Sequence, residues 1–154
     1  MAVLPDSAEA VHIARAAGQL ALAARRPLAL VVLLPAPAST LDPEELACGH
    51  ARISQDTAAV AGRVRPTLDT LGVAARVCSA PYPHDLAARD LDRGMAAAVE
   101  RVARELPAEA VVISTASPAL PHLRIPSGAL HLIKPAVRET LGVEAQPTLT
   151  GNTA

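Results

Sequence analysis

The chain has 154 residues, of which 51% are hydrophobic and 19% are charged, which predicts one folded domain and excludes a disordered chain. A net charge of -1 gives no electrostatic footprint for nucleic acid, and an aromatic content of 1% leaves no stacking platform for single strands. The longest apolar run, residues 28–34, is far too short to span a bilayer. The chain starts without a signal peptide, and its two cysteines form no metal or redox spacing, so we expect a cytoplasmic protein.

The N-terminal part of the chain predicts a strand, a helix and a second strand. Residues 3–4 form a short strand that stops at Pro5. Asp6 and Ser7 are both good N-caps for the helix that follows, which runs to about residue 24. Residues 28–34 are apolar at every position, which is typical of a strand buried on both faces in a parallel sheet.

The middle of the chain predicts a long helix, a strand and a third helix. Asp42 can cap the long helix, which extends to Leu71 with a kink or break at its internal proline. Residues 73–78 form a strand, and a loop follows at 80–85. A third helix, capped by Asp85 or Asp90, then reaches residue 106.

The last third of the chain predicts a buried strand, a loop, a helix and a weak strand. Residues 110–114 are fully apolar and form the buried strand. The proline-rich segment 115–127 is a loop, and a helix opens at Ser127–Gly128 and ends at residue 141. Residues 143–150 form the last strand, and 151–154 are a loose tail outside the domain at 1–150.

The repeated strand–helix order predicts a single doubly wound α/β domain, with about five parallel strands and helices on both faces. In this sheet we expect the apolar strands at 28–34 and 110–114 to lie side by side in the same direction. Ligands bind such sheets beyond the carboxyl ends of the strands. The candidate positions are therefore residues 5–6, 34–35, 79–80 and 115–127.

Several residues at these strand ends lie in the register of a known family. Asp6 follows the short first strand, where that family carries an Asp near the adenosine, and residues 71–73 introduce an alternating strand. With the element order, these residues resemble the universal stress protein family over nearly the whole chain. ATP-binding members carry G-x2-G-x9-G-[ST] after the fourth strand. The same register here falls on Thr115, Pro118, Gly128 and Ala129.

The resemblance implies a flavodoxin-like domain, a homodimer, and a nucleotide site whose phosphate-binding part is degraded. Glycines in such a loop let the backbone approach phosphates, whereas Pro118 has no N–H and Thr115 adds a Cβ. The resemblance therefore predicts lost or weakened ATP binding, and it implies no cofactor other than ATP. The candidate nucleotide-binding residues are Asp6, Leu34, Thr115, Arg124, Ser127 and Gly128.

Three hypotheses remain open from the sequence. The first is a non-enzymatic regulatory or binding module of the universal stress protein type, with an unidentified protein partner. The second is retained adenine-nucleotide binding through Asp6, the Leu34 backbone and the helix start at Ser127–Gly128. The third is a small enzyme or accessory protein in which His84 or Arg124 takes part, although no nucleophile or metal set accompanies them. An N-cap role for Asp6 and a solvated loop position for Arg124 are the plain structural alternatives.

Overall fold

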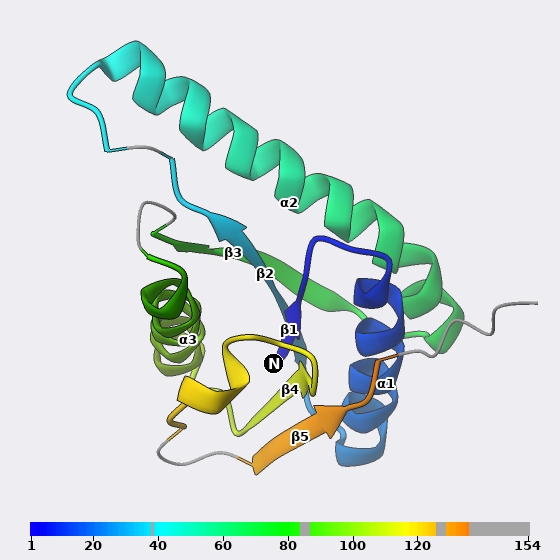
Figure 1. Cartoon of the computed structure of the whole chain (residues 1–154). Coiled ribbons are helices and arrows are strands. Elements are labelled where there is room, and N and C mark those ends of the chain that lie inside the picture. The colour runs from blue at the N-terminus through cyan, green and yellow to red at the C-terminus, as the bar shows by residue number, and fades with distance from the viewer. Residues whose placement is uncertain (38, 84–86, 126–128, 136–154) are drawn as a thin grey trace, which may run out of the picture.

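The computed structural model describes residues 1–37, 39–83, 87–125 and 129–135, and shows a five-stranded parallel sheet between helical layers (Figure 1). The strand order is β3-β2-β1-β4-β5, and every neighbouring pair is parallel. The predicted doubly wound α/β fold is thereby confirmed. The elements are β1 (Ala2–Leu4), α1 (Glu9–Ala24), β2 (Leu28–Pro35), α2 (Pro43–Leu71), β3 (Ala75–Tyr82), α3 (Ala88–Glu105), β4 (Ala110–Ser114), the short 3-10 helix η1 (Leu120–His122) and β5 (Ala129–Ile133).

The short strand β1 lies at the centre of the sheet. Ala2 is in register with Leu30 of β2 on one side and with Val112 of β4 on the other. The expectation that the two long apolar strands are neighbours is therefore wrong, although they do run in the same direction. Three residues are enough for a central strand here because β1 is buried along its whole length.

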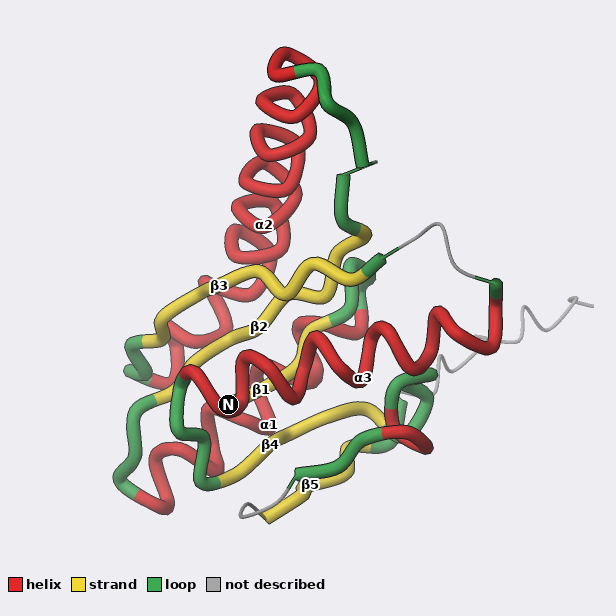
Figure 2. Tube along the Cα trace, turned by 90° about the vertical axis from the view of Figure 1, so that its left-hand side faces the viewer, coloured by secondary structure: helices red, strands yellow, loops and turns green. Residues whose placement is uncertain are grey.

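The two faces of the sheet are covered by different helices. Helices α1 and α2 pack on one face, where they share a core with β1 and β2. Helix α3 covers the other face, and Figure 2 shows it on the opposite side of the strands from α1. This arrangement follows from right-handed crossovers, because the chain steps outward from β1 to β3 and then returns across the sheet to β4.

Helix ends agree with the sequence for α2 but not for α1. Asp42 caps α2 by accepting a hydrogen bond from the Glu44 N–H at 2.8 Å, and Gly72 closes the helix at a φ of 68°. Helix α2 continues through its internal proline as one element, so no break divides it. Helix α1 begins later than predicted, with Ala8 as its N-cap and no side-chain capping bond. The plain reading of Asp6 as an N-cap is therefore wrong.

Two strands differ from the prediction. Strand β3 extends through the expected loop to Tyr82, which is in register with Pro35. The proline within β3 is tolerated because β3 is an edge strand among those described, so the N–H groups on its outer side need no partner strand. The helix predicted from Ser127–Gly128 is wrong over Ala129–Ile133, which forms β5 in register with β4. Its Leu-His-Leu alternation fits a strand with unlike faces. The predicted strand at 143–150 and the tail lie outside the described residues.

Candidate functional site

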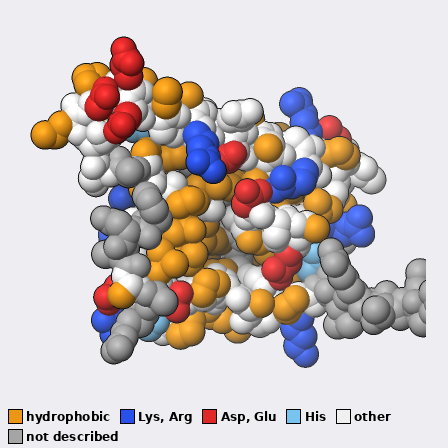
Figure 3. Space-filling model, turned by 45° about the horizontal axis from the view of Figure 1, so that its top comes forward, with side chains coloured by type: hydrophobic (Ala, Val, Ile, Leu, Met, Phe, Trp, Pro, Cys, Tyr) orange, Lys and Arg blue, Asp and Glu red, His pale blue; other side chains and the backbone are white. Residues whose placement is uncertain are grey.

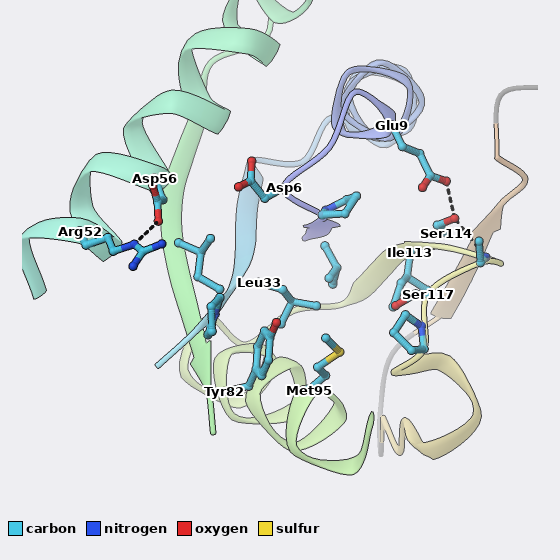
Figure 4. A pocket seen from close by; sticks show the side chains of 16 residues that line it. Asp6, Glu9, Leu33, Arg52, Asp56, Tyr82, Met95, Ile113, Ser114 and Ser117 are labelled. Atoms are coloured by element: carbon cyan, nitrogen blue, oxygen red, sulfur yellow. Dashed lines mark hydrogen bonds and ion pairs between the residues drawn. The ribbon is translucent and has the colours of Figure 1, made fainter. Parts of the chain in front are cut away.

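A cavity of about 340 Å³ lies at the carboxyl ends of the strands, where the sequence places the site. Its walls come from the ends of β1, β2, β3 and β4, from α1, α2 and α3, and from the segment after β4 (Figure 4). Figure 3 shows a face of the molecule on which hydrophobic side chains gather in a hollow beside charged ones. The lining residues are Val3, Pro5, Asp6, Glu9, Leu33, Leu34, Pro35, Arg52, Asp56, Tyr82, Met95, Ile113, Ser114, Ala116, Ser117 and Pro118.

Part of the wall of this cavity is apolar. Val3, Leu33 and Ile113 come from three neighbouring strands and all belong to the packing on the α3 face. Met95 of α3 adds a flexible thioether side chain from the same side. A wall of this composition suits the hydrophobic body of a small organic molecule.

Tyr82 supplies the aromatic part of the wall. It ends β3 and is the chain's single aromatic residue. In Figure 4 its ring lies near Met95 and Leu33. Partial burial raises the pKa of the Tyr82 phenol above its ordinary value of 10.0. The phenol is thus neutral at physiological pH and can contact a ligand through its ring.

A short hydrogen-bonded chain fixes one carboxylate at the cavity. Glu9 stands in the first turn of α1, and the Ser114 hydroxyl donates to its Oε1 at 2.5 Å. Ser114 is 3% exposed, and its Oγ accepts a hydrogen bond from the Ala116 N–H at 3.1 Å. The two bonds hold the hydroxyl in one orientation and so orient the Glu9 carboxylate.

Two ion pairs occupy the α2 side of the cavity. The Arg63 guanidinium donates to Asp6 Oδ1 at 2.5 Å, which joins α2 to the segment between β1 and α1. Arg52 and Asp56 form a looser pair at 3.9 Å, one helical turn apart on α2. Both pairs are partly exposed, so solvent screens them and their contribution to folding is small.

The segment after β4 uses its own backbone donors internally. The Thr115 N–H donates to the Ile133 carbonyl at 2.8 Å, and the Ser117 N–H donates to the Ser114 carbonyl at 3.1 Å. The Ala116 N–H is bonded to Ser114 Oγ, and Pro118 has no N–H at all. None of these four positions therefore offers a free N–H to a phosphate group.

The structure brings only some of the predicted site residues together. Asp6 and Leu34 line the cavity, with Leu34 only 2% exposed. Thr115 is exposed beside it, whereas Arg124 lines a second cavity of about 320 Å³, and its N–H donates to Glu100 Oε1 at 2.5 Å. Ser127, Gly128 and His84 lie outside the described residues.

Sequence reasoning missed several residues that line the cavity. In the sequence, Glu9 is marked only by its position close to the start of a helix, and Ser114 only by its position at the end of an apolar run. Arg52 and Asp56 lie in the interior of a long polar helix, where no local signal marks them. Tyr82 could have been found as the single aromatic residue next to a strand end.

Fold and cavity together define a doubly wound α/β domain with a small-molecule cavity at the strand ends. Among the described residues, no helix is long and apolar enough to cross a membrane, and no group of three or more His, Cys, Asp or Glu side chains is placed to hold a metal ion.

No protein-family model matches the chain, and no curated protein shows a significant match. In fold it is similar to solved universal stress proteins, the family that its sequence resembles. A protein of that family from Burkholderia pseudomallei is 23% identical over 86% of this chain and 93% of that chain, with a TM-score of 0.45. The Archaeoglobus fulgidus protein in complex with dAMP is 18% identical over 86% and 96%, with a TM-score of 0.49. A universal stress protein in complex with cAMP is 15% identical over 86% and 94%, also at 0.49.

Proposed function

We propose that this chain is a non-enzymatic regulatory or binding module of the universal stress protein type, which takes a small organic molecule in the strand-end cavity and has lost or weakened ATP binding. The observation that carries this proposal is that the N–H groups of residues 115–117 are already hydrogen-bonded within the protein, while Pro118 has no N–H. Phosphate-binding loops work by turning free N–H groups toward the anion. A segment whose N–H groups are bonded internally must break those bonds before it can bind phosphate.

The charges around the cavity also support lost or weakened ATP binding. Asp6, Glu9 and Asp56 line it, while Arg52 is the single basic side chain among the lining residues. A triphosphate carries several negative charges. Asp6 and Asp56 are paired with arginines, so the close-range repulsion comes mainly from the Glu9 carboxylate. A neutral or positively charged ligand meets no such repulsion.

Retained adenine-nucleotide binding is the second candidate, because Asp6 and Leu34 do line one cavity. Under this alternative Asp6 contacts the ribose and the Leu34 backbone contacts the base. The nucleotides that name two of the similar structures, dAMP and cAMP, are the natural probes for it. The Asp6 carboxylate, however, is already paired with Arg63.

Isothermal titration calorimetry with adenosine, AMP, ADP and ATP tests this proposal. We expect the affinity to stay flat or to fall as phosphates are added. Saturation by ATP at a hundredfold excess over its dissociation constant adds about 2.7 kcal/mol to the free energy of unfolding. A gain of that size in the free energy of unfolding with ATP, together with a smaller gain with adenosine, would contradict the proposed loss of phosphate binding.

We also propose a homodimeric, cytoplasmic protein. Among the described strands, β5 lies at an edge of the sheet, and its Leu130 and Leu132 side chains are 43% and 50% exposed. An edge strand with exposed leucines is a surface that a second copy can cover. Light scattering coupled to size exclusion should give twice the 15.8 kDa mass of the chain, and Leu132→Lys should shift it to the monomer. A monomeric wild-type protein contradicts the dimer.

A further inference from the structure

We propose that the ligand of the strand-end cavity is a small organic cation, with an ammonium or amidinium group on a flat apolar body, and that Glu9 binds the cationic group. We base this inference on the proposed function, and it names the class of molecule that the cavity selects. The cationic head would be held at the α1 side and the apolar body against the α3 side.

Glu9 is built as a fixed acceptor at the cavity wall. Its carboxylate is half-buried, and one oxygen is held by the hydroxyl of the buried Ser114. The Ala116 N–H fixes that hydroxyl in turn. A carboxylate that is oriented before binding loses little side-chain entropy when a cation arrives, and its hydrogen bonds to a charged donor are strong.

Among the carboxylates that line the cavity, Glu9 is the one without a cationic partner in the described part of the chain. Asp6 is paired with Arg63 at 2.5 Å, and Asp56 with Arg52 at 3.9 Å. Across the described ranges, by contrast, no basic side chain forms an ion pair with Glu9. Within the described part of the chain, Glu9 is thus a half-buried negative charge at the cavity wall without an ion-pair partner. A carboxylate at a partly enclosed wall attracts a cation more strongly than one surrounded by water, because the local dielectric constant is lower.

The opposite side of the cavity suits a flat apolar body. Figure 4 places Glu9 on one side and Tyr82 with Met95 on the other. Leu33 and Ile113 lie between them at the strand ends. An aromatic ring can stack on Tyr82 and contact the Met95 thioether, and both contacts favour aromatic ligands.

Three probes of nearly the same shape test the charge requirement: benzamidine, benzamide and benzoate, which are cationic, neutral and anionic at neutral pH. Titration calorimetry gives the affinities, and the fluorescence of Tyr82, the single aromatic residue, gives an independent readout from the cavity itself. We expect benzamidine to bind about tenfold or more tightly than benzamide, and benzoate to bind most weakly. The advantage of benzamidine should shrink as salt is raised.

Glu9→Gln tests the role of the carboxylate, because glutamine keeps the size and still accepts from Ser114. The matched control is Glu45→Gln, which removes a first-turn acid from α2 far out on an exposed surface. Both variants lose the same favourable interaction with a helix N-terminus, so a difference between them reports the cavity. Glu9→Gln should bring the affinity of benzamidine down to that of benzamide, while Glu45→Gln should leave the ratio unchanged.

The outcomes separate this inference from the proposed function. Equal affinities for the three probes, a preference for benzamidine that survives Glu9→Gln, or no binding of any probe would each overturn the cation site. Adenosine binding that exceeds ATP binding leaves the proposed function standing in all three cases. Circular dichroism and thermal unfolding of Glu9→Gln show whether the variant is folded. If it is not, Ser114→Ala provides the second test, because it frees the carboxylate without removing its charge and should weaken benzamidine binding several-fold.

Discussion

The two faces of the sheet are packed to different degrees. On the α1–α2 face, buried residues from three strands and two helices join in one continuous core, which includes Leu4, Ile13 and Val60. On the α3 face the buried residues fall into two smaller clusters. Several partly buried members of these clusters, such as Leu33 and Tyr82, also line the cavity. One face thus carries most of the packing, and the less filled face contributes the apolar wall of the site.

Truncating one side chain on each face should give the largest effects. Ile13 is fully buried in the continuous core, so Ile13→Ala should lower the free energy of unfolding by about 2–5 kcal/mol. Met95 is half-buried beside the cavity, so Met95→Ala should cost clearly less stability but should weaken probe binding. Urea unfolding and titration calorimetry measure the two quantities. Equal losses of stability would mean that the α3 face is as tightly packed as the other.

Substitution of two glycines in the helices of the α1–α2 face should give unequal effects of intermediate size. A Cβ at Gly62 meets no atom within 4 Å, so Gly62→Ala should stabilise the protein by about 1 kcal/mol through helix propensity alone. A Cβ at Gly18 would lie 2.9 Å from Leu71 Cδ1 and 3.3 Å from Leu68 Cδ2. Gly18→Ala should be the less stable of the two variants, because the Leu71 and Leu68 side chains must move aside for the new methyl group. The thermal midpoints of the two variants decide this, and a Gly18→Ala protein as stable as Gly62→Ala would show a looser contact.

The pH titration of Tyr82 should have the smallest effect on stability, and it reports on the α3 face of the sheet. Because burial raises the pKa of the folded phenol above 10.0, the unfolded chain loses this proton first. The associated stability is therefore complete below pH 10 and is lost as the pH rises through the folded pKa. Near-ultraviolet absorbance follows the phenolate without ambiguity, since no other tyrosine is present. A bound probe should raise the pKa further, and a titration at the ordinary value would mean that the ring is solvated.

Much of the fold could be predicted because its signals are local. The apolar runs at 28–34 and 110–114 mark buried strands, since a strand covered on both faces needs no polar residue. Asp42 and Gly72 mark the ends of α2 because capping depends on a residue and its immediate neighbours. The error at Ala129–Ile133 has the opposite cause: a five-residue segment with weak local preference is decided by its pairing with β4.

The site was predicted in position but not in composition. The strand ends were the right place, because the carboxyl ends of parallel strands share one edge of the sheet. Asp6 was expected to cap a helix or contact a nucleotide, and its pairing with Arg63, 57 residues away, could not be inferred from either neighbourhood. The same holds for Glu9 and Ser114, which are 105 residues apart.

By itself, the sequence determined which segments are buried, where the long helix begins and ends, and which end of the sheet carries a cavity, because hydrophobic periodicity and capping act over a few residues. Only the tertiary structure decided that β1 is central, that Glu9 is bonded to Ser114 at the cavity wall and that the N–H groups at 115–117 are already hydrogen-bonded. Those features depend on which distant segments meet, and contacts across the sheet leave no trace in local pattern.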